Sequence, residues 1–437
     1  MALSTQPYKG ARDFYPEDKR IQKYIFKTMR DVCEQFGYEE YDAPVIEPEE
    51  LYLAKSSDEI VNEQTYVFTD RGDRRVVIRP EMTPTVSRMV AGKRQELAYP
   101  VRWYSIPNLW RYERPQRGRL REHWQLNVDI FGLPGLEAEH EMILVADGIM
   151  KTFGAKSDMY TIKLNSRKLV NALMFDVLGL DETQAQTMIR LIDRMHKMDY
   201  GEFAGKVDGL FGPSQRDKGE TDLLLDFLKV SSLGELPEAL QKLESVNEIT
   251  KLVKLLETSK ITNVRFDPTL MRGFDYYTDV VFEVFDNDPD NNRSMFGGGR
   301  YDGLVGLFGV EPVPTVGFGM GDVTLQNFLE THKLLPELQP ETDAYVVLIG
   351  DVYAKAQKPI AELREMGLRL AIDASGRKAD KQLKSALKKD IRYVIFIGEK
   401  ELAAEQYPMK NLQTGVEEKH GLQRIVSTIK DYRKQAK

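Results

Sequence analysis

A helical stretch in the middle of the chain separates two strand-rich regions, and this order restricts the folds that the chain can adopt. Over residues 166–258 apolar residues recur at spacings of three and four, the period of a helix that buries one face. Strand signals rich in aromatic and β-branched residues resume at 263–266 and 276–286. We therefore predict that residues 166–258 are a helical insertion between residues 1–165 and 259–332, which form one strand-rich domain.

The first strand-rich region begins and ends with helical patterns. Apolar residues at helical spacing predict helices over residues 17–36 and 137–154. Between these helices, β-favouring runs predict strands over residues 65–68, 74–79, 101–113 and 122–131. The last two strands flank an arginine-rich loop.

The end of the chain has a different pattern. Residues 333–342, KLLPELQPET, contain two prolines and are a plausible linker. The strand-like runs AYVVLIG (344–350), LRLAID (368–373) and YVIFIG (393–398) then alternate with helical segments. This alternation predicts a small α/β domain with a largely parallel sheet over residues 342–437.

Charge is distributed unevenly along the 437 residues, whose net charge is −7. Residues 342–437 contain 19 Lys and Arg against 13 Asp and Glu, hence +6, and the first 341 residues carry −13. A basic C-terminal module is compatible with nucleic acid binding, but an ordinary lysine-rich surface gives the same count.

Composition excludes several classes of protein. No run approaches ~18 apolar residues, so we expect no membrane helix. The N-terminal segment lacks the apolar core of a secretory signal. Cys33 is the only cysteine, which excludes an intramolecular disulfide and a multi-cysteine zinc site. The five histidines show no metal-binding spacing, so we predict no metal site in the protein itself. A reducing, cytoplasmic location fits best.

The arginine loop, residues 111–121 (RYERPQRGRLR), has the most unusual local composition. It holds five arginines and one glutamate, and Gly118 would let it fold over a ligand. Guanidinium groups bind phosphate through paired hydrogen bonds, so the loop is a candidate site for a triphosphate or an RNA end. A solvated loop without a ligand is the alternative. Gln125 and Asp129, four residues apart on a predicted strand and hence on one face, favour a site.

Three further segments could carry chemistry. In RPEMT, Glu81 and Thr83 can both accept from an ammonium group, although a proline-flanked turn is the simpler interpretation. In LMRGFDYYTDVVFEVF, Arg272 would need a phosphate or carboxylate partner if it faces a pocket; a surface ion pair is the alternative. The glycine runs at 296–304 and 316–321 match no nucleotide-binding fingerprint. Their glycines would permit a ligand to approach the backbone closely, and turns between strands are the simpler interpretation.

Together and in this order, these segments resemble the histidyl-tRNA synthetase family of class II aminoacyl-tRNA synthetases over essentially the whole chain. YKGARDFYPED is similar to the family's opening segment, and FGYEEYDAPVIEP resembles motif 1, a helix and strand at a dimer interface. RWYSIPNLWRYERPQRGRLREHWQLNVDIFG resembles motif 2, and LMRGFDYYTDVVFEVF resembles the histidine-specific motif. GGGRYDGL follows it, and VGFGMGDVTL lies where motif 3 belongs.

The resemblance implies an α+β fold. It consists of a class II antiparallel sheet of six or seven strands with helices, a helical insertion, and a C-terminal α/β anticodon-binding domain at residues 342–437. The catalytic domain would then be residues 1–165 and 259–332, and the chain would form a homodimer.

The implied activity is that of a histidine–tRNA ligase. The carboxylate of L-histidine would attack the α-phosphate of ATP, with Mg²⁺ accompanying the nucleotide, to give histidyl-adenylate and pyrophosphate. The histidyl group would then pass to the 3′ end of tRNA(His). No side chain need act as a general base, because a carboxylate is already ionised at neutral pH.

Residue roles follow from the resemblance position by position. The implied histidine-binding residues are Glu81, Thr83, Gln125, Asp129, Arg272, Tyr276 and Tyr277. Among them, Glu81, Thr83 and Gln125 would hold the α-amino group, and Asp129 and Tyr276 the imidazole. The implied ATP-binding residues are Arg111, Glu113 and Arg121. Arg111 and Arg272 would be catalytic, Arg111 at the α-phosphate and Arg272 against the charge that develops there.

The sequence departs from the family pattern at motif 3. The family's motif usually ends in an arginine that contacts ATP, and here that position holds Thr324. Arg293 and Arg300 are candidate substitutes between which the sequence does not decide. Asn127 also replaces a residue that is usually small.

Two non-catalytic alternatives belong to the same fold. A synthetase-like chain can be a regulatory subunit of ATP phosphoribosyltransferase, but such relatives generally lack the C-terminal domain and the catalytic arginines that this chain keeps. A sensor that binds tRNA or histidine without charging is the other alternative, and Thr324 is its only support.

Overall fold

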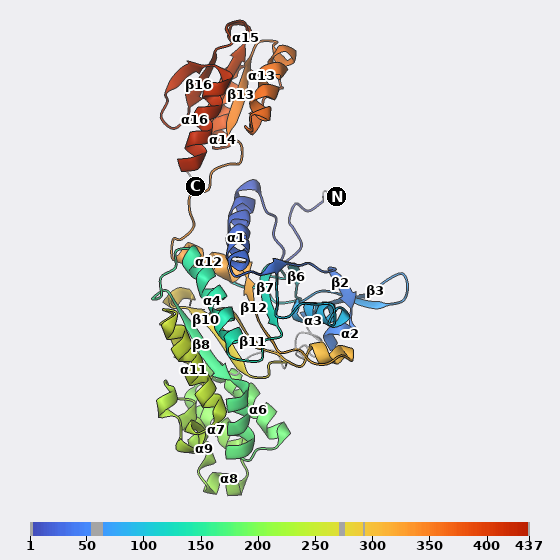
Figure 1. Ribbon diagram of the computed structural model, residues 1–437, viewed down its shortest axis with the longest axis vertical. Helices are drawn as coiled ribbons and strands as arrows, with labels where there is room; N and C mark the ends of the chain where they lie inside the picture. Colours follow the sequence, from blue (N-terminus) through green and yellow to red (C-terminus); the bar gives the residue numbers. More distant parts are fainter. Residues whose placement is uncertain (1–2, 54–63, 271–275, 292, 436–437) are drawn as a thin grey trace. The chain divides into compact units, whose positions relative to one another are not determined.

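The computed structural model describes residues 3–53, 64–270, 276–291 and 293–435 (Figure 1). Arg272, predicted to be catalytic, lies outside these residues. The chain forms two compact units, which are described separately. The N-terminal unit comprises Met1–Phe14 and Gln22–Leu335, and the C-terminal unit comprises Pro336–Lys437 together with Tyr15–Ile21.

A nine-stranded sheet is the centre of the N-terminal unit (Figure 1). Its strands lie in the order β1 (Glu39–Glu40), β5 (Val101–Ser105), β7 (Glu122–Phe131), β12 (Thr315–Gly321), β11 (Ser294–Arg300), β10 (Val280–Asp286), β8 (Tyr160–Ser166) and β9 (Val264–Phe266), and β6 (Asn108–Trp110) pairs with part of β7. The six strands from β5 to β8 are antiparallel, as the resemblance implies. The strand predicted at 263–266 is β9. It and the short strand β1 pair with their neighbours in parallel, an orientation that the sequence did not predict.

Two predicted strands differ from those observed. The run 101–113 is not one strand, because Pro107 lacks the backbone N–H that a continuous ladder requires, and the chain divides there into β5 and β6. Strand β10 begins at Val280 rather than at residue 276. Tyr276 and Tyr277 therefore lie before the strand, in the approach to the sheet.

Helices cover both faces of this sheet. On one face, α4 (Glu137–Thr152) and α12 (Asp322–Thr331) pack against β7 and β12. On the other, α3 (Thr83–Gly92) packs Val86 and Val90 against Phe131 at the end of β7. α1 (Pro16–Gln35) follows the predicted helix at 17–36 closely and buries Ile25, Met29 and Val32.

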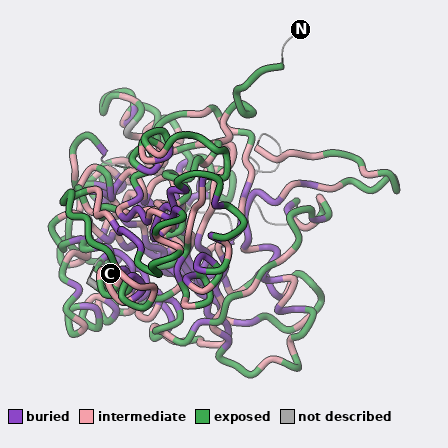
Figure 2. The backbone as a smooth tube through the Cα atoms, turned by 90° about the horizontal axis from the view of Figure 1, so that it is seen from above, coloured by how far each residue is buried: buried purple, intermediate pink, exposed green. Residues whose placement is uncertain are grey.

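A small three-stranded sheet extends from the N-terminal unit. It consists of β2 (Ile46–Pro48), β4 (Arg75–Ile78) and β3 (Tyr66–Thr69), with the short helix α2 (Glu50–Leu53) nearby. The turn predicted at 70–73 joins β3 to β4, and Figures 1 and 2 show this hairpin projecting with an exposed tip.

The insertion is helical, as the apolar spacing predicted. It contains α5 (Arg167–Asn171), a π-helical turn (Ala172–Val177), α6 (Glu182–Asp193), α7 (Tyr200–Leu210), α8 (Pro213–Asp217), α9 (Glu220–Phe227), α10 (Glu238–Gln241) and α11 (Glu244–Thr258). Leu173, Phe203 and Phe227 belong to a separate apolar core. Asp181 caps α6 by accepting from the Gln184 N–H at 2.8 Å.

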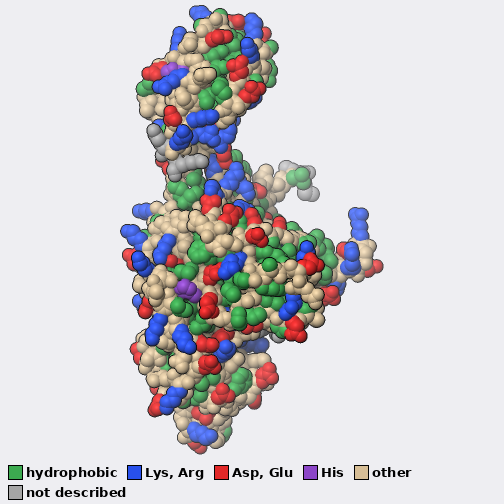
Figure 3. Space-filling view, viewed as in Figure 1, with side chains coloured by type: hydrophobic (Ala, Val, Ile, Leu, Met, Phe, Trp, Pro, Cys, Tyr) green, Lys and Arg blue, Asp and Glu red, His purple; other side chains and the backbone are tan. Residues whose placement is uncertain are grey.

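The C-terminal unit is an α/β domain. Its sheet has the order β14 (Leu370–Ile372), β13 (Ala344–Ile349), β15 (Tyr393–Gly398), β16 (Tyr407–Asn411) and β17 (Glu417–His420), and its helices are α13 (Tyr353–Glu365), α14 (Ala379–Lys388), α15 (Glu399–Ala404) and α16 (Leu422–Gln435). The first three strands are parallel, as predicted, and β16 and β17 extend the sheet in antiparallel fashion. Lys and Arg side chains are frequent on its surface (Figure 3).

Over the described part of the chain, no helix combines the length and the apolar character needed to span a bilayer.

Candidate functional site

Four glycines form a flat strip on one face of the large sheet. Gly317 and Gly319 of β12 pair with Gly299 and Gly297 of β11, and residues paired directly across antiparallel strands share a face. The interpretation of these glycine runs as turns is therefore wrong, whereas close approach of a ligand to the backbone stays a prediction. We call Gly297, Gly299, Gly317 and Gly319 the glycine floor.

Polar and aromatic side chains cover the glycine floor. A Cβ atom on Gly317 would lie 2.1 Å from Asp129 Oδ1, and one on Gly319 would lie 2.5 Å from Gln125 Nε2. On β11, a Cβ on Gly297 would lie 2.8 Å from Cγ of Glu283. A Cβ on Gly299 would likewise lie 3.1 Å from the ring of Tyr277. Glycine is needed because these side chains occupy the space that a side chain on the floor would take.

Gln125 and Asp129 lie on the same face of β7, as their spacing predicted. They pair with Gly321 and Gly317 of β12, and Asn127 lies between them. Glu283 of β10 lies at the opposite side of the glycine floor. The floor thus separates an amide and a carboxylate on β7 from a carboxylate on β10.

Glu81 and Thr83 lie at the start of α3, facing a tyrosine. The hydroxyl of Tyr276 donates to Glu81 Oε2 at 3.2 Å and lies 3.4 Å from Thr83 Oγ1. Glu81 is only 2% exposed. Burial raises the pKa of Tyr276 well above its usual value, with the charge of Glu81 adding to the effect, so its hydroxyl stays a donor.

Asp129 is a buried carboxylate with one partner. The hydroxyl of Tyr301 donates to Asp129 Oδ1, whereas Asp129 Oδ2 is buried and has no hydrogen-bond partner among the described residues. Burial raises the pKa of Asp129 to about 7, and the Tyr301 hydrogen bond opposes that rise. Sequence reasoning did not identify Tyr301, although it lies within the glycine run at 296–304.

Tyrosine rings connect these two carboxylates. The ring centroids of Tyr276 and Tyr277 are 5.0 Å apart, and those of Tyr276 and Tyr301 are 5.7 Å apart. Six of the seven predicted histidine-binding residues are described, and the sheet and α3 bring them to one side of the glycine floor. Their roles stay a prediction, as does that of Arg272, which is not described.

The predicted ATP-binding residues lie at the base of the arginine loop. The N–H of Arg111 donates to the carbonyl of Arg121 at 2.8 Å, and Nε of Arg111 donates to the carbonyl of Pro80 at 2.9 Å. The second bond places Arg111 beside the Glu81 segment. The guanidinium of Arg121 lies 3.9 Å from the ring centroid of Tyr112, and Glu113 lies 3.6 Å from Arg119.

Three residues near the predicted ATP-binding residues were not identified from the sequence: His123, Arg12 and Asp322. Burial lowers the pKa of His123 to about 3, and the positive charges of Arg111 and Arg12 add to the effect, so its ring is neutral at pH 7. Arg12 donates to Asp322 at 2.7 Å, and Asp322 also accepts from the N–H of Trp124 at 2.9 Å.

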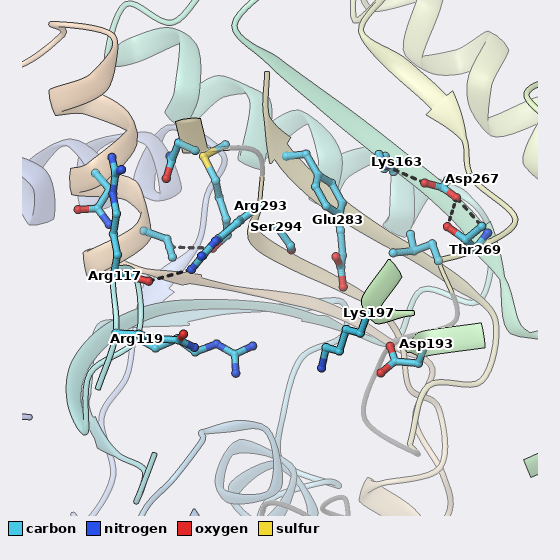
Figure 4. A pocket seen from close by; sticks show the side chains of 18 of the residues that line it. Arg117, Arg119, Lys163, Asp193, Lys197, Asp267, Thr269, Glu283, Arg293 and Ser294 are labelled. Carbon is cyan, nitrogen blue, oxygen red and sulfur yellow. Dashed lines mark hydrogen bonds and ion pairs between the residues drawn. The ribbon is translucent and has the colours of Figure 1, made fainter. Parts of the chain in front are cut away.

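A cavity of about 480 Å³ extends from the tip of the arginine loop across the sheet (Figure 4). Its lining includes the loop residues 116–119, Glu283 of β10, Arg293 before β11, and Asp193 and Lys197 of the insertion. A cavity of this size holds a small ligand. Glu283 lines the cavity and also lies over Gly297, so the cavity adjoins the edge of the glycine floor.

The two candidate substitutes for the missing motif 3 arginine have different surroundings. Arg300 is buried and donates to both carboxylate oxygens of Glu139 on α4, at 2.6 and 2.7 Å. This ion pair lies on the face of the sheet that α4 covers, and it occupies the Arg300 guanidinium. Arg293 lines the cavity.

The described residues contain no group of three or more His, Cys, Asp or Glu side chains arranged to hold a metal ion. Any divalent cation here would therefore take most of its ligands from a substrate and from water, as Mg²⁺ does at nucleotide sites.

Comparison with known proteins gives a consistent result. A family model described as histidyl-tRNA synthetase matches residues 10–323, and one described as anticodon binding domain matches residues 343–432. The chain is 43% identical over 412 residues to a histidine–tRNA ligase of Leptospira biflexa, covering 94% of each chain. It is 36% identical over 421 residues to a histidine–tRNA ligase of Thermoplasma volcanium, covering 95% of this chain and 96% of that one.

Solved structures agree in fold. The structure of histidyl-tRNA synthetase from Nostoc sp. PCC 7120 is similar with a TM-score of 0.81 and 24% identity, covering 99% of this chain and all of that one.

Proposed function

The chain belongs to the histidyl-tRNA synthetase family and is a histidine–tRNA ligase, and from this premise we propose how its residues divide the work of activating histidine. Histidine lies over the glycine floor between Glu81 and Asp129, and ATP lies in the adjoining cavity under the arginine loop. The observation that carries this placement is Asp129 Oδ2, a buried carboxylate oxygen with no partner among the described residues.

The chemistry of histidine matches the two carboxylates. The α-ammonium group donates to Glu81 and Thr83, with Gln125 nearby, because these side chains offer acceptors at one end of the floor. An imidazole N–H donates to Asp129 Oδ2 at the other end. Tyr276 and Tyr277 close the side of this pocket. Tyr301 is a positioning residue, since its hydrogen bond fixes the orientation of the Asp129 carboxylate.

The reaction needs stabilisation of charge more than proton transfer. The carboxylate of histidine attacks the α-phosphorus of ATP, a new O–P bond forms, the bond between the α- and β-phosphates breaks, and pyrophosphate leaves. Arg111 binds the α-phosphate, and Arg121 and Glu113 hold further parts of ATP. Arg272 is expected to stabilise the same developing charge. The terminal adenosine hydroxyl of tRNA(His) then attacks the activated carbonyl and AMP leaves.

Magnesium accompanies the nucleotide in this proposal. A Mg²⁺ ion bound with ATP needs only one or two protein carboxylates, and Glu283 faces the cavity at the edge of the glycine floor. When bound, the ion neutralises phosphate charge.

A homodimer is supported by the small sheet that contains β2, β4 and β3. Ile46 and Phe68 lie on the same face of this sheet and are 50% and 41% exposed, whereas Val77 on the opposite face is 1% exposed. An apolar sheet face of this kind is typical of a protein interface. Sedimentation of the full chain at micromolar concentration tests this assignment.

The cytoplasm, where tRNA is charged, is the proposed location.

The non-catalytic alternatives are less well supported. The regulatory-subunit alternative is not favoured, because the chain matches histidine–tRNA ligases over nearly its full length and contains an anticodon-binding domain.

The test is ATP–pyrophosphate exchange with each of the twenty amino acids and no tRNA. Exchange with histidine alone is the expected result. Histidinol, which keeps the ammonium group and the imidazole but lacks the carboxylate, should inhibit exchange without supporting it. Silence with all twenty amino acids from a folded protein would overturn the proposal and favour the sensor.

A further inference from the structure

We propose that Arg293 binds the polyphosphate of ATP and holds the arginine loop over it, in place of the arginine missing at position 324. The inference rests on the proposed placement of ATP in the cavity. It concerns the strand β11 side of the cavity, where no residue has yet been given a role.

The side chain of residue 324 already points to the start of β11. Thr324 Oγ1 donates to the carbonyl of Met295 at 2.7 Å, two residues after Arg293. Thr324 and Arg293 both line the cavity. A guanidinium group at position 293 therefore lies in the part of the cavity that a longer side chain at position 324 would reach.

The arginine loop also closes over this point. A Cβ on Gly118 would lie 3.7 Å from Cγ2 of Thr324, so the loop tip passes close to the short threonine side chain. Arg293 Nη1 donates to the carbonyl of Arg117 at 3.1 Å. Arg293 thus connects the start of β11 to the loop tip (Figure 4).

The charge of Arg293 is not neutralised by any carboxylate of the described residues. Three other cations of this region are paired: Arg12 with Asp322 at 2.7 Å, Lys163 with Asp267 at 2.8 Å, and Arg300 with Glu139. Arg293 is exposed and lines the cavity, and the one described hydrogen bond of its side chain is to a backbone carbonyl. The rest of its planar fork can donate to phosphate oxygens in pairs.

Two cations of the lining besides Arg293, Arg117 and Lys197, also have no carboxylate partner within the described ranges. Lys197 comes from the insertion, and Arg117 contributes its carbonyl to Arg293 from the loop tip. Of these three cations, only Arg293 extends from the sheet beside Thr324. We therefore assign phosphate binding to Arg293.

The experiment measures the affinity of MgATP and of AMP by equilibrium dialysis, together with KM values in ATP–pyrophosphate exchange. Arg293→Ala should weaken MgATP binding roughly 10- to 100-fold, as expected for a lost charge-assisted contact. Its affinity for AMP and its KM for histidine should stay within about twofold, because the lost contact is to the outer phosphates. Arg293→Lys, which keeps the charge but not the fork, should fall between.

Arg94→Ala is the matched control, because Arg94 is partly exposed and also donates to a backbone carbonyl, that of Glu311 at 2.7 Å, without lining the cavity. It should bind MgATP normally. Adding Thr324→Arg to Arg293→Ala should recover much of the lost affinity.

Unchanged MgATP affinity in Arg293→Ala, or an equal loss for AMP and histidine, would overturn the assignment. Because dialysis needs no turnover, the outcome stands even if the wild-type chain fails to exchange with histidine, a failure that would count against the proposed function alone.

Discussion

The carboxylate of Asp129 is buried, and only one of its two oxygens has a hydrogen-bond partner among the described residues. A carboxylate oxygen without a partner is costly in a folded protein unless a ligand supplies the missing donor. Tyr301 holds the other oxygen, so the carboxylate is oriented before any ligand arrives. This arrangement predicts that Asp129 contributes to binding of histidine rather than to the stability of the fold.

Asp129→Ala should raise the KM for histidine at least tenfold while leaving the KM for ATP nearly unchanged, since a hydrogen bond to a charged group contributes about 1.5–3 kcal/mol. The measurement is ATP–pyrophosphate exchange at varied histidine. Asp70→Ala, which removes a partly exposed carboxylate from the β3–β4 hairpin, is the control. A normal KM for histidine in Asp129→Ala would show that the imidazole binds elsewhere.

The same burial predicts how stability depends on pH. The pKa of Asp129 is raised to about 7 in the folded protein, against about 3.9 in an unfolded chain. At pH values between these two pKa values, the folded state binds more protons at this group than the unfolded state does. The free energy of unfolding therefore falls as pH rises through this range, and the contribution of Asp129 becomes constant above pH 7. Asp129→Asn removes the titration.

The free energy of unfolding of Asp129→Asn, minus that of the wild type, should therefore increase by about 2 kcal/mol between pH 5.5 and pH 8. Urea denaturation at the two pH values, followed by a probe of the N-terminal unit, measures it. A difference that is the same at both pH values would mean that Asp129 titrates at an ordinary carboxylate pKa.

At the scale of elements, the neighbouring strands β11 and β12 carry glycines on one face. Side chains from other segments can therefore lie across that face. Gly319 lies under Gln125, and a Cβ there would approach Gln125 Nε2 to 2.5 Å. Gly319→Ala should therefore displace Gln125 and raise the KM for histidine several-fold, with a smaller effect on unfolding because the amide group can move. Exchange kinetics and urea denaturation separate the two effects.

Gly205→Ala is the control for this change. Gly205 is an exposed residue of α7 with nothing within 4 Å of a Cβ position, so alanine should slightly stabilise the helix and leave the kinetics unchanged. If Gly319→Ala behaved in the same way, the glycine floor would not be needed for side-chain placement.

The glycine floor also shows how far the sequence could predict the elements. Periodicity located α1 and the helices of the insertion, because each buries one regular face. Continuous apolar runs located the parallel strands β13 and β15, which are buried along nearly their whole length. Sequence reasoning misassigned the glycine strands as turns, because the reason for those glycines is the side chains of β7, β10 and the Tyr277 segment. Such cross-strand reasons have no local signal in the sequence.

The candidate site was predictable only where the family motifs cover it. Glu81, Gln125 and Asp129 could be named because they stand at motif positions. The choice between Arg293 and Arg300 could not be made, because it depends on Glu139, a residue of α4 that pairs with Arg300 from a distant part of the sequence. Tyr301 was missed for the same reason, since its partner lies on β7.

At the scale of the whole molecule, net charge conceals a division between the two ends of the chain. The protein carries −7 overall, yet residues 342–437 carry +6. Within that region α14 buries Gln382 and Ala386 and exposes Lys381, Lys384 and Lys388, which recur at helical spacing on its outer face. A lysine row of this kind attracts phosphate even on an acidic protein.

Affinity for tRNA should therefore depend strongly on salt, and part of that dependence should come from α14. Each phosphate contact contributes about 0.7–0.9 to the slope of log affinity against log salt concentration. Replacing Lys381, Lys384 and Lys388 together by Gln should weaken binding at low salt and reduce the slope by up to about 2–3.

The matched control replaces the same three residues by Arg, which keeps the charge and should keep the slope. Filter binding of deacylated tRNA to the full chain over a range of salt concentrations measures both variants. Equal slopes for the Gln variant and the wild type would place the RNA on another surface, because a face that releases no counterions makes no contact with phosphate.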